Sequence, residues 1–263
     1  MGSATAQALA ASTQALAAAK DVTLDTAREL FVAARTVGDS SQLSGALADP
    51  SASVESRQNV VSAVFGGLSV ASQSVLSAAV AQRWSNADEL VDGIEELAIR
   101  SAAIAEPGVD IEGELFAFAR LVAANPELEL ALGSRLGGED AKGELVERLL
   151  DGSSAGAATT LIVSSLVRRP RERRVRQLLS RAIRFVSAQR GLVVATVYTA
   201  TPLSDAQRTR LSDALSRRYD GEVSLNVVID PAVVGGLRVQ IADDVIDGSI
   251  SARLADLRQK LAG

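Results

Sequence analysis

The residues that most resemble a chemical site lie near the C-terminus. Two glycines, Gly235 and Gly236, precede three aspartates at positions 243, 244 and 247. Grouped carboxylates can hold a calcium ion, but an EF-hand loop needs oxygen ligands at positions 1, 3 and 5 and a glutamate at position 12. Counted from the first aspartate, position 3 is valine and position 12 is leucine. The spacing therefore predicts a turn, which Asp-Gly pairs favour, and no metal site.

A second match, GSSAG at 152–156, has the G-x-S-x-G pattern of a hydrolase nucleophile. Such a serine needs a histidine base and a strand-turn-helix setting. The chain has no histidine and no cysteine, so it lacks the commonest proton-transfer side chain and the thiolate nucleophile. It also contains no glycine-rich phosphate-binding motif. We therefore expect no catalytic residue, no cofactor and no metal, and a protein that is not an enzyme.

Arginines are concentrated at 167–176, where the sequence VRRPRERRVR has six in ten residues, and Arg181 and Arg184 follow. A solvated helix start, a docking patch for an acidic protein and an RNA-binding surface are the three interpretations. Residues 1–105 carry a net charge of −5, residues 106–190 carry +1 and residues 191–263 carry −1. No segment is strongly basic, and the aromatic residues that stack on bases make up 3% of the chain. The candidate docking residues are Arg168, Arg171, Arg173, Arg174 and Arg176.

An internal sequence repeat indicates which structural elements surround this cluster. With an offset of 85 residues, Glu29-Leu30-Phe31 aligns with Glu114-Leu115-Phe116, and the alignment continues without a gap. Leu30, Ala34 and Val37 recur at i, i+4 and i+7, which is helical spacing, and Gly, Pro, Asp and Asn separate the periodic runs. We read a tandem duplication of a helical bundle, with copy one at 1–105 and copy two at 106–190. The two copies are expected to share the helix near 88–105, with Trp84 in the core.

The last segment, 191–263, has a different pattern. A strand rich in Val and Thr begins at Leu192, and Ser204 and Gln207 form a predicted capping box for the helix that follows. Two alternating strands then precede a final helix, which gives the order β-α-β-β-α. The expected fold is mainly α, with two tandem fused helical bundles followed by a small α/β C-terminal domain. No apolar run is long enough to span a bilayer, and the N-terminus does not have the pattern of a signal peptide.

The C-terminal segment also resembles a known family. Asp230-Pro231, Val234-Gly235-Gly236-Leu237 and Val245-Ile246-Asp247-Gly248-Ser249 are similar to the signature of the F-type ATP synthase delta subunit, the family of the mitochondrial oligomycin-sensitivity-conferring protein. Thr199–Ser204 matches the start of that family's C-terminal domain. The signature positions are Pro231, Gly235, Gly236, Leu237, Asp247, Gly248 and Ser249. The usual member has one helical bundle, and this chain resembles a long form with a duplicated helical domain.

The resemblance implies a peripheral-stalk (stator) subunit. It implies that the helical region binds the N-terminal helices of the ATP synthase alpha subunits and that the C-terminal domain binds the end of the b-subunit stalk. It also implies one copy per complex, at the cytoplasmic face of the bacterial cell membrane, with membrane association only through partners and no nucleic acid. Leu254, Leu257 and Leu261 are candidates for the stalk contact. The alternative is an RNA-binding regulatory protein that acts through Arg168–Arg184.

Overall fold

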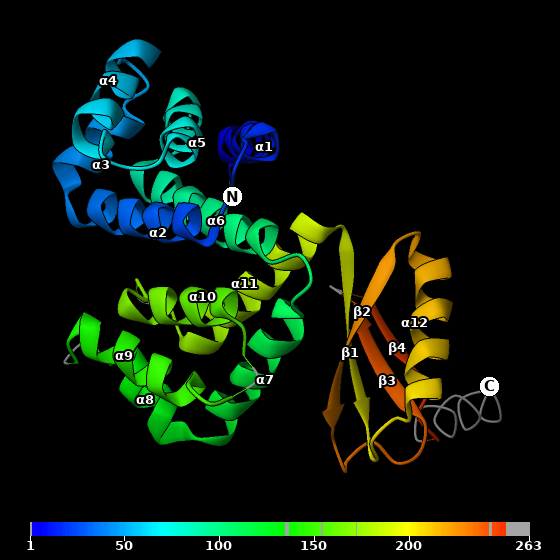
Figure 1. The fold of residues 1–263 in the computed structure, drawn as a ribbon. Helices are drawn as coiled ribbons and strands as arrows, with labels where there is room; N and C mark the ends of the chain where they lie inside the picture. Colours follow the sequence, from blue (N-terminus) through cyan, green and yellow to red (C-terminus); the bar gives the residue numbers. More distant parts are fainter. Residues whose placement is uncertain (1, 135–136, 154, 172, 242–243, 251–263) are drawn as a thin grey trace, which may run out of the picture. The chain divides into compact units, whose positions relative to one another are not determined.

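The computed structural model describes residues 2–134, 137–153, 155–171, 173–241 and 244–250 (Figure 1). The chain divides into two compact units, residues 1–186 and 187–263. The described residues form twelve helices and four strands, and every strand lies in the second unit. The expected fold class is therefore confirmed: a mainly helical chain ends in a small mixed sheet with one helix. The further division of the helical unit into two bundles stays a prediction.

The first half of the helical unit contains six helices, and polar side chains begin most of them. Ser40, Ser53, Ser69 and Asn86 each accept a hydrogen bond from a backbone N–H in the first turn of the helix that follows. Such caps satisfy donors that a helix start leaves free. The helices are α1 Ser3–Ala18, α2 Leu24–Asp39, α3 Ser41–Ala48, α4 Val54–Phe65, α5 Val70–Ala81 and α6 Ala87–Ala105.

The second half repeats the helix bounds of the first. It contains α7 Ile111–Ala124, α8 Pro126–Gly133, α9 Glu139–Leu150, α10 Ala157–Arg168 and α11 Val175–Arg190. Moving α3 and α4 forward by 85 positions gives the bounds of α8 and α9, and the same shift places α1 on α6 to within two residues at either end. The boundary between the two compact units falls inside α11.

Helix α6 is largely buried, with twelve of its nineteen residues shielded from solvent. Leu90, Ile94 and Leu97 are all fully buried, and the helix packs against α1, α2, α3 and α5 before it and α10 after it. Trp84 is buried, as predicted, and its ring lies against Gly93 of α6, where a Cβ atom would come within 2.5 Å of it. Because apolar residues occur on more than one face of α6, a single helix can serve as packing partner for helices from both halves.

The second unit contains β1 Leu192–Thr199, α12 Asp205–Tyr219, β2 Glu222–Ile229, β3 Leu237–Ile241 and β4 Asp244–Asp247. The sheet order is β2-β1-β3-β4: β1 and β2 are parallel, joined through α12, and the other two pairs are antiparallel. Ser204 and Gln207 form the predicted capping box at the start of α12. The core contains Ala195, Val197, Leu215, Val223, Val239 and Ile241.

One prediction for this unit is wrong, and another cannot be judged. A turn was predicted for the aspartates at 243, 244 and 247. Position 243 lies outside the described residues, and Asp244–Asp247 forms β4, with Val239 opposite Ile246. The Val-Ile pair between the aspartates gives this stretch a β-forming centre that the acidic flanks concealed. The predicted final helix, with Leu254, Leu257 and Leu261, lies outside the described residues.

Candidate functional site: the arginine cluster and the acidic face of α6

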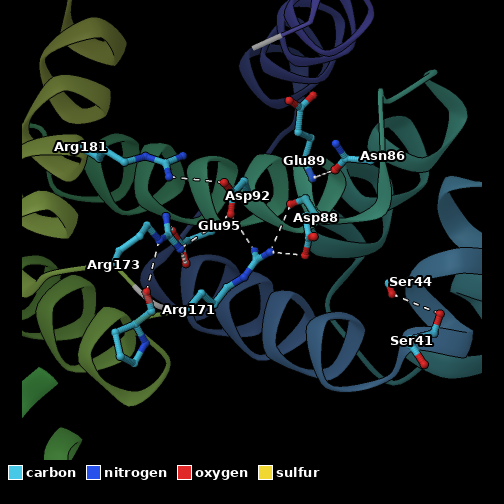
Figure 2. A network of polar contacts seen from close by, with 11 residues as sticks. Ser41, Ser44, Asn86, Asp88, Glu89, Asp92, Glu95, Arg171, Arg173 and Arg181 are labelled. Carbon is cyan, nitrogen blue, oxygen red and sulfur yellow. Dashed lines mark hydrogen bonds and ion pairs between the residues drawn. The ribbon is translucent and has the colours of Figure 1, made fainter. Parts of the chain in front are cut away.

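Three carboxylates lie on one face of α6. Asp88, Asp92 and Glu95 stand at i, i+4 and i+7, which places their side chains in one row along the helix (Figure 2). The arginines that meet this row come from the loop after α10 and from α11, about 80 residues further along the chain. The site therefore depends on the packing of α6 beside the last helices of the unit.

Arg171 links two of these carboxylates. Its Nη1 lies 2.7 Å from Oδ1 of Asp92 and its Nη2 lies 2.8 Å from Oδ1 of Asp88. Arg171 has φ of 48°, an uncommon left-handed conformation for a non-glycine residue. Arg181 of α11 approaches Asp92 from the other side, with 3.4 Å between Nη1 and Oδ2. Asp92 thus accepts hydrogen bonds from two arginines (Figure 2), and Nη2 of Arg173 lies 3.7 Å from its Oδ1.

Arg173 pairs with the most buried carboxylate of the row. Its Nη2 donates to Oε2 of Glu95 at 3.1 Å, and its Nη1 lies 3.0 Å from Oε1 without hydrogen-bond alignment. Burial raises the pKa of Glu95, while the neighbouring Arg173 acts against that rise. Buried ion pairs recover part of the cost of removing both charges from water, so this pair fixes the geometry more than it adds stability.

The remaining arginines bind acidic residues of other helices. Arg168 contacts Asp140 and Glu147 of α9, Arg169 contacts Asp39 of α2 and Glu139 of α9, and Arg176 contacts Glu129 of α8. Arg169 therefore joins a helix of the first half to a helix of the second. The cluster is not a solvated helix start, because most of its guanidinium groups have carboxylate partners within the chain.

Arg174 differs from the rest of the cluster. It is exposed, and among the described residues its guanidinium has no ion pair. An RNA-binding surface needs free positive charge, and the internal carboxylates neutralise most of it here. Within the described ranges no group of three His, Cys, Asp or Glu side chains could hold a metal ion, and no helix is long and apolar enough to cross a bilayer.

The structure brings most of the predicted signature residues together at one end of β3. Gly235 and Gly236 have φ of 65° and 76°, the conformation expected for them. Gly248 N–H donates to the carbonyl of Leu237 at 2.9 Å, and Ser249 N–H donates to Oδ1 of Asp247 at 2.9 Å. Pro231 lies in the preceding loop, just beyond the end of β2. These hydrogen bonds hold the segment after β4 against the start of β3, so the signature residues stabilise a local backbone conformation.

Comparison with known proteins identifies the family. The family model described as ATP synthase delta (OSCP) subunit matches residues 98–261, more than half of the chain. The chain belongs to the ATP synthase delta (OSCP) subunit family. It is therefore a stator component of the F-type ATP synthase, a non-catalytic stalk subunit of a complex that couples ATP synthesis to proton transport.

Delta subunits from bacteria also match the part of the chain outside that family model. The ATP synthase subunit delta of Leifsonia xyli is 50% identical over 265 residues, which cover all of both chains. That of Streptomyces griseus is 37% identical over 272 residues, again all of both chains. The similarity to these relatives therefore extends over the N-terminal residues that lie outside the region matched by the family model.

Proposed function

We propose that the chain joins the catalytic head of the ATP synthase to its peripheral stalk through two different surfaces. The helical unit would bind the N-terminal helices of the alpha subunits, and the C-terminal unit would bind the end of the b subunit. One copy per complex would then hold the head still while the rotor turns, at the cytoplasmic face of the bacterial membrane. The full-length match to bacterial delta subunits is the observation that carries this proposal.

The division of the chain into two units supports a connecting role. Each unit has its own buried core, with Leu90, Ile94 and Leu97 in the first and Val197, Leu215 and others in the second. Two independently packed bodies can each offer a surface to a different partner. No cofactor enters this proposal, because holding two partners requires shape and charge only.

Within the helical unit, we propose two bundles, 1–105 and 106–190, that share the helix near 88–105. The repeated helix bounds support this division. Copy two lies within the region that the family model matches, so it is our candidate for holding an alpha-subunit helix. Copy one would be a spacer or would contact a further partner. The stalk contact is proposed for the C-terminal unit, with Leu254, Leu257 and Leu261 as candidate residues.

Reconstitution with membranes from which the catalytic heads and this subunit have been removed tests the whole proposal. Membranes that retain the proton channel and the b subunit are mixed with purified head particles, with or without the full-length chain. We expect ATP-driven proton pumping to return only when the chain is added, and cross-linking to join the chain to both alpha and b. Pumping of equal strength without the chain, or cross-links to neither subunit, would overturn the proposal.

A further inference from the structure

Helices α6 and α11 have nearly the same pattern of buried apolar residues. Under the 85-residue offset, Leu90 and Ile94 of α6 correspond to Val175 and Leu179 of α11, and all four side chains are buried. Helix α6 packs against α1, and α11 in turn meets α6 through Arg181. Because apolar burial has no direction, it does not by itself decide whether α11 packs beside α6 or beside α1.

The acidic row of α6, formed by Asp88, Asp92 and Glu95, has no equivalent in α1 (Figure 2). The positions 85 residues earlier are Ser3, Gln7 and Ala10. All three are exposed, and none carries a charge. An arginine that pairs with a carboxylate of α6 would therefore meet a neutral side chain at the corresponding position of α1.

The arginines that meet the acidic row are equally particular to the second half. Arg171, Arg173 and Arg181 correspond to Asn86, Asp88 and Glu96 under the same offset. Two of these three positions are thus acidic in the first half and basic in the second. If α6 of another molecule met the acidic row in place of α11, carboxylates would face carboxylates, which is strongly unfavourable.

Burial makes a wrong pairing costly. The side chains of Arg171, Arg173 and Arg181 are only 19%, 16% and 26% exposed, and each lies within 4 Å of a carboxylate of the acidic row. A buried ion pair adds little to stability, but a buried charge that loses its partner is strongly unfavourable. The cluster therefore raises the free energy of a wrong arrangement more than it lowers the free energy of the correct one.

We propose that this charge pattern determines which helices pair within the helical unit. It directs α11 to α6 and disfavours two alternatives: α11 beside α1 in the same chain, and α6 of a second copy on the acidic row. Chains with similar successive segments are prone to such misassembly. Specificity depends on the difference in free energy between partners, and mismatched charges increase that difference. The proposal does not depend on which subunits the chain joins.

Transfer of the acidic row to α1 tests the proposal in the full-length chain. The transfer variant combines Ser3→Asp, Gln7→Asp and Ala10→Glu. These positions are exposed, so the substitutions leave the buried contacts of α1 in place. The variant offers the arginines a second set of carboxylates, and a share of the chains should then refold with α11 beside α1.

The distance between α1 and α11 reports the pairing. Because the chain has no cysteine, Lys20→Cys and Ser180→Cys give two spin-label sites at exposed positions, just after α1 and within α11. Pulsed electron paramagnetic resonance after refolding from urea measures the distance between the labels. We expect one distance population in the otherwise unchanged chain. In the transfer variant we expect a second, shorter population, at least about tenfold above its level in the unchanged chain.

A matched control carries the same three negative charges elsewhere on α1. It combines Ala6→Glu, Ala17→Glu and Ala18→Glu, which alter exposed positions outside the transferred row. The control should keep the single distance population. A second population of equal size in the control would overturn the proposal, because added charge alone would then explain it. A single population in the transfer variant would overturn it as well.

Removal of the arginine charges gives an independent test, which applies even if the transfer variant does not fold. The neutral variant combines Arg171→Gln, Arg173→Gln and Arg181→Gln. Its control combines Arg208→Gln, Arg210→Gln and Arg217→Gln, at exposed positions of α12. We expect only the neutral variant to refold into a mixture, with dimers detected by light scattering or the shorter distance between labels. A neutral variant that refolds entirely to the wild-type monomer, with the wild-type distance, would contradict the proposal.

Discussion

Two glutamates, 85 positions apart in the sequence, stabilise the starts of two helices. Glu29 of α2 accepts hydrogen bonds from the backbone N–H and the hydroxyl of Ser69, the N-cap of α5, at 3.0 and 2.6 Å. Glu114 of α7 accepts from the N–H of Gly156, the N-cap of α10, at 2.9 Å. A carboxylate at a helix start interacts favourably with the free N–H groups and the helix dipole. The sequence showed these glutamates as a repeated Glu-Leu-Phe motif, but their role depends on a distant helix.

Glu29→Gln should lower the free energy of unfolding at neutral pH and should make that free energy less sensitive to acid. Partial burial alone raises the pKa of Glu29, but hydrogen bonds from Ser69 and Ser72 outweigh it and lower that pKa below its ordinary value. The stabilisation is therefore present above the unfolded-state pKa and lost as pH falls through the folded-state pKa. We expect Glu29→Gln to lower the free energy of unfolding at neutral pH by about 0.5–1 kcal/mol, with a smaller difference from wild type in acid.

Urea denaturation across the acid range measures this effect. Glu55→Gln is the matched control, because Glu55 is an exposed glutamate in the first turn of α4 with no hydrogen bond to another helix among the described residues. A difference between Glu29→Gln and wild type that stays constant from neutral pH into acid would count against the role assigned to Glu29.

Two glycine substitutions separate backbone strain from steric overlap. Gly191 and Gly236 both have positive φ, but a Cβ atom on Gly191 meets nothing within 4 Å, whereas one on Gly236 comes 2.4 Å from the carbonyl oxygen of Gly248. Gly191→Ala should cost about 1 kcal/mol, and Gly236→Ala about 2–4 kcal/mol, in the free energy of unfolding of the C-terminal unit. Chemical denaturation measures both costs, and equal costs for the two variants would show that the contact with Gly248 is unimportant.

At the scale of elements, the repeat predicted much of the helical unit because periodic apolar residues and caps are local signals. The helix near 88–105 was expected from periodic residues such as Leu90, Ile94 and Leu97, and it was expected to be shared because the 85-residue offset also pairs Leu9 with Ile94. The partners of the arginines could not be predicted, because Asp88, Asp92 and Glu95 lie about 80 residues away and meet them only after folding. Strand β4 was missed because its four residues carry an aspartate at each end, and pairing with β3 outweighs that composition.

The acidic face of α6 should depend on its central carboxylate. The Asp92 side chain is 34% exposed and lies within 4 Å of Arg171, Arg173 and Arg181. The Asp88 side chain is 92% exposed, and among the described residues its one ion pair is with Arg171. We expect Asp92→Asn to lower the free energy of unfolding by about 1–3 kcal/mol, because three arginines lose one partner. Asp88→Asn, the matched control, should cost less than about 1 kcal/mol. Equal effects in urea denaturation would contradict the central position of Asp92.

At the scale of the whole molecule, the two units should unfold as separate cooperative bodies. Each has its own core, so a change in one core need not destabilise the other. In differential scanning calorimetry we expect two transitions, with Asp92→Asn lowering the Tm of one and Gly236→Ala lowering the Tm of the other. A single transition that both variants shift by similar amounts would show that the units unfold together.

The burial of α6 also has a mechanical consequence. Two bundles joined by a short loop would bend at that loop when pulled sideways, and part of each rotor step would be absorbed by the bend. Here α6 packs against four helices that precede it in the sequence, α1, α2, α3 and α5, and against α10, which follows it. Arg169 also forms ion pairs with both α2 and α9. Bending the helical unit would therefore require apolar contacts and ion pairs to break at the same time. We expect this part of the stator to behave as a stiff spring that returns stored elastic energy and dissipates little of it.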